Sequence, residues 1–272
     1  MRTRNKRGRV NVRELSGLGG WRARASLLWA PIALPQGLWL KRRIPRLPEA
    51  PGERSGLCPA NTDTPEQRPL RLVAIGESPL AGVGLDDQGQ NLVPLLAAAL
   101  ALQLDVDVSW QIAARNGATV GTARRQLLPQ LSDEPADLAL IGLGVNNSLR
   151  LDTVDRWQSD MSRLIDDLRA RLGPVPVVLA GVPDMGRFPS LPPPLSWMLG
   201  ARARWLDQGL AVLAGRLDQV VHAPIPLDAR FETLFADDGF HPSAIGHQAW
   251  SESLLPLAAS LIERGILESE TT

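Results

Sequence analysis

The 272-residue sequence is poor in the residue types on which several kinds of site depend. Its one cysteine, Cys58, excludes an internal disulfide and any metal site built from several thiolates. It has 3 histidines, His222, His241 and His247, so imidazole chemistry must use one of them. Lys and Arg together number 29, as do Asp and Glu, and this balance gives no electrostatic reason to expect nucleic acid as a partner.

A long hydrophobic run is also missing. The most apolar segment, 25–40, contains two prolines and is shorter than the roughly 20 residues that a membrane span needs. Basic residues precede it, as in a signal peptide, but no small-residue cleavage site follows and 41–43 is KRR. We expect an N-terminal extension, with peripheral membrane contact through residues 21–43 as the alternative. The expected location is therefore cytoplasmic or membrane-associated, and export stays open.

Length and composition predict one domain with an appendage. Residues 1–68 are expected to form a basic and apolar extension followed by a linker, because 45–69 is rich in Pro, Gly, Glu and Asn. The domain itself is expected over residues 69–268.

Beyond residue 69, short apolar runs alternate with segments of helical periodicity. Runs of the length and composition of strands buried on both faces are 70–75, 106–114, 137–144, 175–182 and 219–227. Apolar residues recur every three or four positions over 154–172, and 205–217 and 244–262 show the same pattern. This alternation predicts an α/β fold with a parallel sheet covered by helices on both sides. Ligands then bind at the carboxyl ends of the strands.

Polar residues suited to acyl chemistry follow these strands. Ser78 lies at a sharp turn after the first run, where its hydroxyl can act as a nucleophile, although a lone serine there is more often a helix N-cap. His241 is the candidate base, because Asp238 can accept a hydrogen bond from one ring nitrogen and leave the other facing the hydroxyl. Asn146 and Gly117 can donate N–H groups to a developing oxyanion, each worth about 3 kcal/mol, although singly each is more often a turn residue.

Four blocks carry these residues in order: GESPLAGVG (76–84), NGAT (116–119), GVNN (144–147) and DGFHP (238–242). With them, the sequence resembles the SGNH hydrolases, or GDSL-type esterases and lipases, from about residue 70 to 255. The resemblance implies a flavodoxin-like three-layer α/β/α sandwich with a five-stranded parallel sheet. It also implies hydrolysis of carboxylic esters of small acyl substrates through an acyl-serine, without metal or cofactor.

The resemblance assigns a role to each candidate residue. Ser78 becomes the nucleophile and its backbone N–H the first oxyanion-hole donor, while Gly117 and Asn146 supply the other two. His241 becomes the base and Asp238 its orienting partner. The same residues would serve an acyltransferase or, without turnover, a ligand-binding protein, and both alternatives stay open.

Three positions depart from the family pattern. Glu77 and Pro79 replace the usual Asp and Leu, and Asn147 replaces the Asp of the third block. We expect Pro79 to start the first turn of a helix, and Asn147 to cost a carboxylate that ties loops together. Gly121 is a rival to Gly117 for the glycine role.

Other features suggest weaker interpretations. GLG at 142–144 is reminiscent of a dinucleotide loop but lacks its third glycine. The proline-rich segment 188–195 is expected to form a rigid loop beside the site, with Trp197 as a candidate wall of an acyl pocket. We expect His222 and His247 to serve packing.

Overall fold

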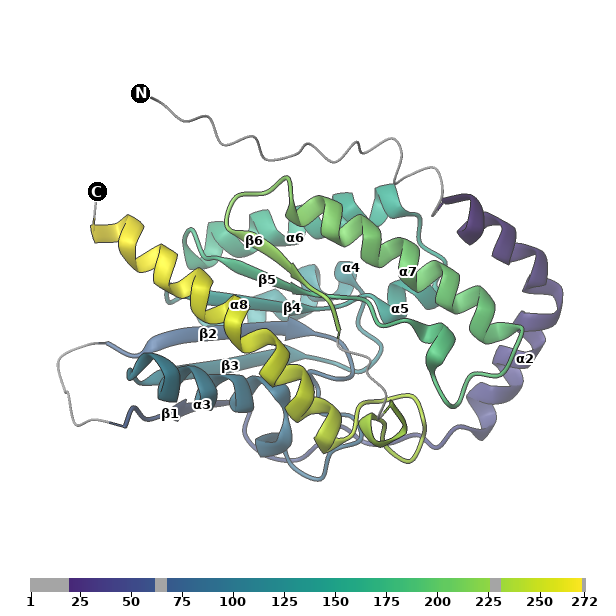
Figure 1. The fold of residues 1–272 in the computed structure, drawn as a ribbon, viewed down its shortest axis with the longest axis horizontal. Coiled ribbons are helices and arrows are strands. Elements are labelled where there is room, and N and C mark those ends of the chain that lie inside the picture. The colour runs from purple at the N-terminus through teal and green to yellow at the C-terminus, as the bar shows by residue number, and fades with distance from the viewer. Residues whose placement is uncertain (1–19, 62–67, 226–230, 271–272) are drawn as a thin grey trace.

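The computed structural model describes residues 20–61, 68–225 and 231–270 (Figure 1). Its centre is one sheet in the order β1-β3-β2-β4-β5-β6, in which β1 is antiparallel to β3 and the other pairs are parallel. The strands are β1 Ser55–Cys58, β2 Leu70–Gly76, β3 Val108–Ala114, β4 Leu138–Gly142, β5 Val177–Ala180 and β6 Val220–Ala223. The five strands expected from the sequence are therefore all present and parallel.

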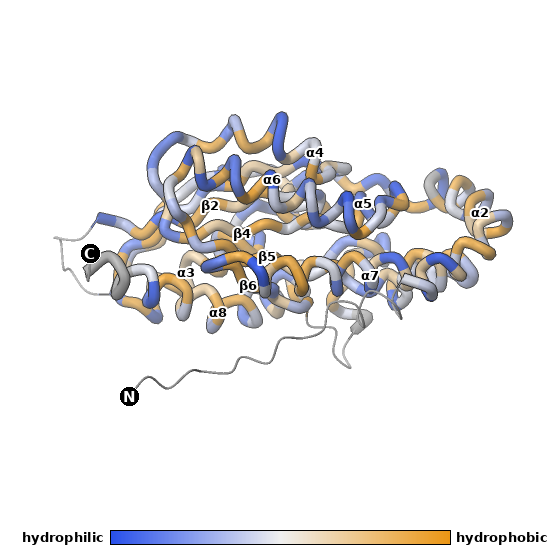
Figure 2. The backbone as a smooth tube through the Cα atoms, turned by 90° about the horizontal axis from the view of Figure 1, so that it is seen from above, coloured by the Kyte–Doolittle hydropathy of each residue, from blue (hydrophilic) through white to orange (hydrophobic). Residues whose placement is uncertain are grey.

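Alternate side chains of the strands enter two separate cores, as the two-residue period of a strand requires. In β2, Leu72 and Ala74 face helices α3 Leu92–Leu104 and α8 Ala244–Glu270, whereas Val73 and Ile75 face the opposite side. Helices α4 Val120–Thr122, α6 Val154–Leu172 and α7 Leu195–Ala214 contribute to the core on that opposite side. Figure 2 shows α3 and α8 below the sheet and α4 and α6 above it, which confirms the expected three layers.

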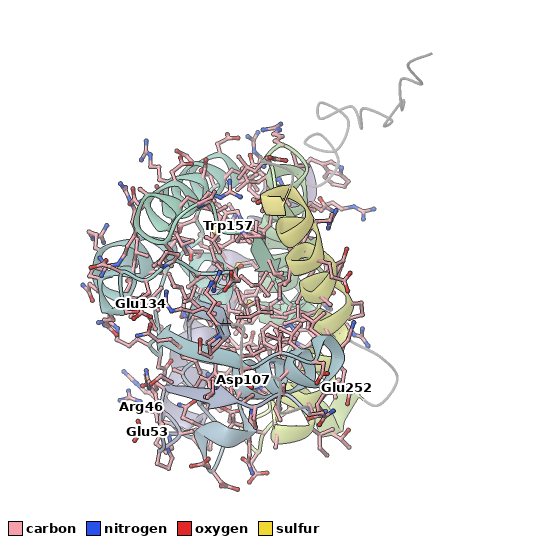
Figure 3. The ribbon with its side chains drawn as sticks, turned by 90° about the vertical axis from the view of Figure 1, so that its left-hand side faces the viewer. Arg46, Glu53, Asp107, Glu134, Trp157 and Glu252 are labelled. Carbon is pink, nitrogen blue, oxygen red and sulfur yellow. The ribbon has the colours of Figure 1, made fainter. Side chains whose placement is uncertain are left out.

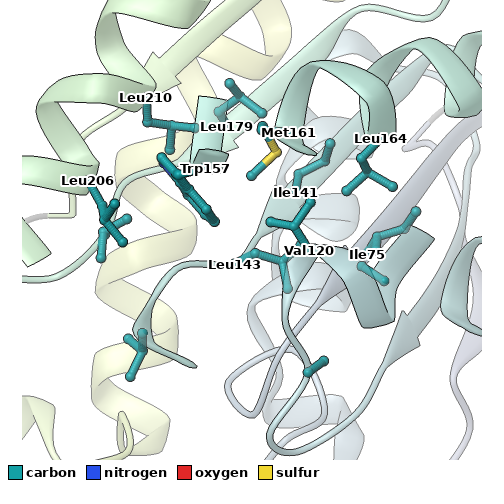
Figure 4. Packing of buried hydrophobic residues seen from close by; sticks show 14 of the residues in the cluster. Ile75, Val120, Ile141, Leu143, Trp157, Met161, Leu164, Leu179, Leu206 and Leu210 are labelled. Atoms are coloured by element: carbon teal, nitrogen blue, oxygen red, sulfur yellow. The ribbon is translucent and has the colours of Figure 1, made fainter. Parts of the chain in front are cut away.

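Helix α6 has the bounds that its apolar stripe predicts. Thr153 caps its first turn by accepting a hydrogen bond from the Arg156 N–H at 3.4 Å, and Gly173, with φ of 87°, ends it. The stripe residues Trp157 and Met161 belong to one core with side chains of the sheet and of α7 (Figure 4). Charged side chains such as Glu134 and Glu252 point outward in Figure 3, whereas Trp157 lies inside.

Two elements differ from expectation. Strand β1 lies within the segment expected to be linker, where Ser55 to Cys58 pair with β3 and extend the sheet to six strands. Helix α7 begins at Leu195, ten residues before the expected start at 205, and its first turns are buried in the core. Periodicity missed this part of α7 because it is apolar on most of its faces.

The described part of the N-terminal extension is helical. Residues 20–25 form a helical segment, a 3-10 turn follows over Ser26–Trp29, and α2 spans Ala30–Arg43. Figure 1 places α2 at the edge of the molecule beside α7, and Ala33 and Leu40 join the core there. Within the described ranges, no helix combines the length and hydropathy needed to cross a bilayer.

Candidate active site

The loop after β2 presents Ser78 at the carboxyl edge of the sheet. Gly76 is required there, because a Cβ at this position would lie 2.3 Å from Leu80 Cδ1 and 2.8 Å from the Gly142 carbonyl oxygen. The chain then turns through backbone hydrogen bonds from Ala81 N to Glu77 O (3.1 Å) and from Val83 N to Ser78 O (3.0 Å).

The expectation that Pro79 opens a helix is wrong. The chain forms only turns from Ser78 to Gly84, because Gly82 and Gly84 have φ of 75° and 94°, in the left-handed region that a right-handed helix cannot use. The next α-helix, α3, begins at Leu92, and its N-cap is Asn91.

His241 and Asp238 form a hydrogen-bonded pair in the loop before α8. The His241 Nδ1 lies 2.6 Å from Asp238 Oδ2, and Asp238 Oδ1 accepts the backbone N–H groups of Phe240 and His241, both at 2.9 Å. Burial alone would raise the pKa of Asp238, but these hydrogen bonds outweigh it and hold the pKa below its usual range. Asp238 is therefore a fixed carboxylate that leaves the other ring nitrogen of His241 available.

Asn146 is held by the glutamate that replaces the family's aspartate. Glu77 Oε1 accepts the Val145 N–H at 2.8 Å, and Oε2 accepts the Asn146 N–H at 2.9 Å and its side-chain Nδ2. One N–H of the Asn146 amide thus points at Glu77 and the second stays free for another acceptor. Burial raises the pKa of Glu77 to about 7, although the donors from Asn146 and Val145 lower it.

Asn147 keeps the connection between two blocks that we expected it to weaken. Its Oδ1 accepts the Val120 N–H at 3.3 Å, so the third block still ties to the segment that follows the second. Its Nδ2 donates to Asp152 Oδ2 at 2.7 Å, a bond that an aspartate could not make. The amide thus provides an acceptor for one loop and a donor for the other.

Gly117 lies in the loop after β3 with φ of 77°, a conformation that other residues adopt at a cost. The neighbouring N–H of Asn116 donates to Glu49 Oε1 at 2.7 Å, and Arg54 pairs with Glu49 at 2.6 Å. Arg54 also donates to the Ala114 carbonyl oxygen at 2.6 Å. Glu49 and Arg54 lie in the supposed linker and belong to no motif, so the sequence does not predict their contact with this loop.

Two cavities meet at His241. The smaller, of about 80 Å³, is lined by Ser78, His241 and apolar side chains that include Phe188 and Trp250. The larger, of about 810 Å³, contains His241, Asn146 and Gly117 along its wall. The predicted catalytic and oxyanion residues therefore lie around two cavities that share His241 in their walls, and Asp238 is bonded directly to His241.

The large cavity is a groove with an unexpected wall. Helix α2 forms one side through apolar residues such as Leu34 and Leu38, and α7 forms the other through Leu195 and Met198. No motif indicates this position, since the apolar run 25–40 predicts only an extension or a membrane contact. Folding is what places it next to the site.

The rival and secondary candidates lie elsewhere. Gly121 sits in α4 beside the Arg125 guanidinium and lines neither cavity. His222 pairs with Asp207 at 2.8 Å. His247 is buried in α8, where its Nδ1 accepts the Leu92 N–H at 3.1 Å and burial lowers its pKa to about 3. Neither histidine lines either of the two cavities.

The proline-rich loop supports the histidine loop. Ser190 donates its hydroxyl to the Gly239 carbonyl oxygen at 2.9 Å, and Phe188 lines the small cavity. Trp197, in contrast, is 53% exposed on α7, with its ring 5.5 Å from that of Trp29, and it lines neither cavity. It is therefore not the acyl-pocket wall that we expected.

Among the residues that the structure describes, no group of three His, Cys, Asp or Glu side chains is arranged to hold a metal ion.

A comparison with curated proteins gave no significant match. Solved structures of similar fold include TesA, 24% identical with a TM-score of 0.55 over 70% of this chain and 99% of that one.

Two further solved structures share the fold. The lipase Lip_vut3 from a goat rumen metagenome is 20% identical, with a TM-score of 0.55 over 70% of this chain and 97% of that one. A carbohydrate esterase family 2 enzyme from Corynascus thermopiles is 16% identical, with a TM-score of 0.57 over 74% and 69% of the two chains.

The family model for GDSL-like lipases and acylhydrolases matches residues 74–249, which is more than half of the chain. The protein therefore belongs to the GDSL-like lipase/acylhydrolase family of ester hydrolases.

Proposed function

We propose that the protein hydrolyses carboxylic esters through an acyl-enzyme on Ser78. The observation that carries this proposal is that Ser78 and His241 line one cavity while Asp238 engages the far nitrogen of the same ring. His241 Nε2 would accept the hydroxyl proton as Ser78 Oγ bonds to the ester carbonyl carbon. The carbonyl π electrons move to oxygen and form the tetrahedral oxyanion.

The oxyanion would be stabilised by N–H donors from three loops. These are the backbone N–H groups of Ser78 and Gly117 and the amide N–H of Asn146 that does not point at Glu77. Gly117 lines the larger cavity, and a Cβ at this position would meet no atom within 4 Å, so there is open space beside this residue for a substrate.

Three proton transfers complete the cycle. When the oxyanion collapses, the C–O bond to the alcohol breaks and protonated His241 gives its proton to the leaving oxygen. Water then loses a proton to His241 Nε2 and attacks the acyl-serine, and the second collapse returns that proton to Ser78 Oγ. The carboxylic acid leaves, and no electrons are gained or lost overall.

The test is Ser78→Ala, assayed against short-chain p-nitrophenyl esters and labelled with a fluorophosphonate. We expect turnover to fall by about 10⁴-fold or more and labelling to disappear. Ser55→Ala, on the exposed edge strand, is the matched control and should behave as the wild type. Undiminished turnover by the Ser78 variant would refute the nucleophile assignment.

Acyl transfer to an alcohol would use the same residues, with the alcohol oxygen in place of water. The same assay with an added alcohol distinguishes the two reactions, because transfer yields a new ester whereas hydrolysis yields only the acid. Labelling without turnover of any ester would indicate a ligand-binding protein instead.

A further inference from the structure

We propose that residues 20–46 dock the protein on an anionic lipid surface and pass an acyl chain of a bilayer lipid ester into the groove. The substrate class rests on the proposed ester hydrolysis, whereas the docking can be tested without it. Helix α2 contributes both to the exposed surface and to the groove, so the two parts of the proposal share the same residues.

The first observation is a concentration of exposed apolar side chains on this segment. Of the 13 large hydrophobic residues exposed among the described residues, 8 lie between Trp21 and Trp39. They are Trp21, Leu27, Leu28, Trp29, Ile32, Leu34, Leu38 and Trp39. Figure 2 shows α2 standing out at one end of the molecule with much of its length in hydrophobic colours. An exposed apolar patch of this kind marks an interaction surface.

The second observation is the charge of the same segment. Residues 20–48 contain six Lys or Arg and no Asp or Glu, and residues 1–48 hold 12 of the 29 basic and 1 of the 29 acidic residues of a chain with no net charge. Arginines flank the exposed indoles, since the Arg43 guanidinium lies 4.3 Å from the ring centre of Trp39 and that of Arg22 5.9 Å from Trp21. Tryptophan beside basic side chains is the composition of helices that lie in a membrane interface.

Charge also selects the occupant of this surface. Anionic lipid attracts each Lys or Arg near the bilayer, whereas a second copy would bring an equally basic segment against this one. An anionic bilayer is therefore complementary to both the apolar and the basic side chains. The segment would lie on the bilayer, because Ala33 and Leu40 hold α2 against the core of the domain.

The third observation links the surface to the site. Leu34 and Leu38 belong to the exposed set and also line the groove, at whose wall Asn146, Gly117 and His241 lie. An acyl chain that leaves the bilayer at α2 would thus enter a groove whose wall includes His241 and two of the proposed oxyanion donors. Arg46 lines the same groove and its side chain is exposed at the molecular surface (Figure 3), where it can pair with an anionic headgroup.

The docking test is co-sedimentation with vesicles of phosphatidylcholine alone or mixed with phosphatidylglycerol. We expect the full chain to pellet with the mixed vesicles, and high salt to release part of it. Leu28→Asp and Ile32→Asp, which leave the groove lining intact, should weaken binding about tenfold each. Leu102→Asp is the matched control, because Leu102 is 59% exposed on α3 and Ile32 is 58% exposed on α2.

Failure to pellet with anionic vesicles would overturn the proposal. So would a dimer in light scattering that Ile32→Asp disperses, since the patch would then be an interface between two copies. Equal loss of binding in Leu102→Asp and Ile32→Asp would also refute a specific surface.

A second measurement separates this inference from ester hydrolysis itself. Leu28→Asp should lower turnover of a long-chain fluorogenic ester embedded in anionic vesicles about tenfold, and leave turnover of a soluble short-chain ester unchanged. Equal vesicle turnover by the variant and the wild type would overturn the lipid-delivery inference but not the hydrolase. If the wild type cleaves neither ester, the proposed function fails, and vesicle binding still decides the docking.

Discussion

The two sides of the substrate space are built by opposite physical means. The sheet side is joined by directional hydrogen bonds, in which Glu77 accepts from Asn146, Asn147 accepts from Val120 and Asp238 accepts from His241. The α2 side contributes apolar side chains such as Leu34 and Leu38, whose attraction depends on buried area and hardly on angle. Hydrogen bonds therefore set where the reacting groups lie, and apolar contact sets what can lie beside them.

This comparison predicts the largest losses on the hydrogen-bonded side. Asp238→Asn should lower kcat about 10⁴-fold, because an amide favours the wrong tautomer of His241. Steady-state kinetics on a soluble ester measures the loss, with exposed Asp237→Asn as the matched control. A loss below about tenfold would show that His241 needs no carboxylate.

Glu77 should make the free energy of unfolding depend on pH. Its pKa is raised from 4.5 to about 7, so the folded state holds a proton that the unfolded chain has lost, and stability falls as pH rises through this window. Relative to Glu77→Gln, the wild-type free energy of unfolding should decrease by about 3 kcal/mol between pH 4.5 and pH 7. Urea unfolding at several pH values measures this, and parallel curves for the two proteins would contradict it.

Glu77→Gln should also reduce catalysis, by less than the loss of a triad member. Glutamine offers one acceptor oxygen, so Asn146 loses part of its hold, and we expect kcat to fall about 30-fold with KM little changed. Glu53→Gln, on the exposed surface, is the control. A change confined to KM would show that Glu77 affects binding and not the position of the oxyanion donor.

The smallest effect belongs to the apolar side and should depend on the substrate. Leu38→Ala removes part of the groove wall, so kcat/KM should fall about tenfold for long-chain esters and stay constant for acetate esters. Leu102→Ala, on a distant exposed face, should change neither. A uniform loss across chain lengths would indicate that α2 positions the catalytic groups, and would remove the contrast between the two sides.

Local patterns predicted much of this protein. The five parallel strands follow from short apolar runs and helix α6 follows from a period of 3.6 residues, and both patterns depend on neighbours in sequence. The expectations failed once through the local backbone conformation and once through a distant contact. Glycines at 82 and 84 stop a helix after Pro79, and pairing with β3 turns part of the supposed linker into β1.

The candidate residues of the site were also visible in sequence, because a tight turn, an acidic partner three residues before a histidine and an amide donor are local features. Their supports were not. Glu49 reaches the loop of Gly117 from a segment more than 60 positions away, and no spacing indicates such a contact.

The amino-acid sequence alone thus determined that the five parallel strands form, which face of α6 is buried and which side chains can carry acyl chemistry, since each depends on local geometry and hydrophobic pattern. Only the tertiary structure decided that Glu77 holds Asn146 and that α2 becomes a wall of the groove. The physical reason is that hydrogen bonds and apolar packing act through space over a few ångströms, and their partners are chosen when the chain folds.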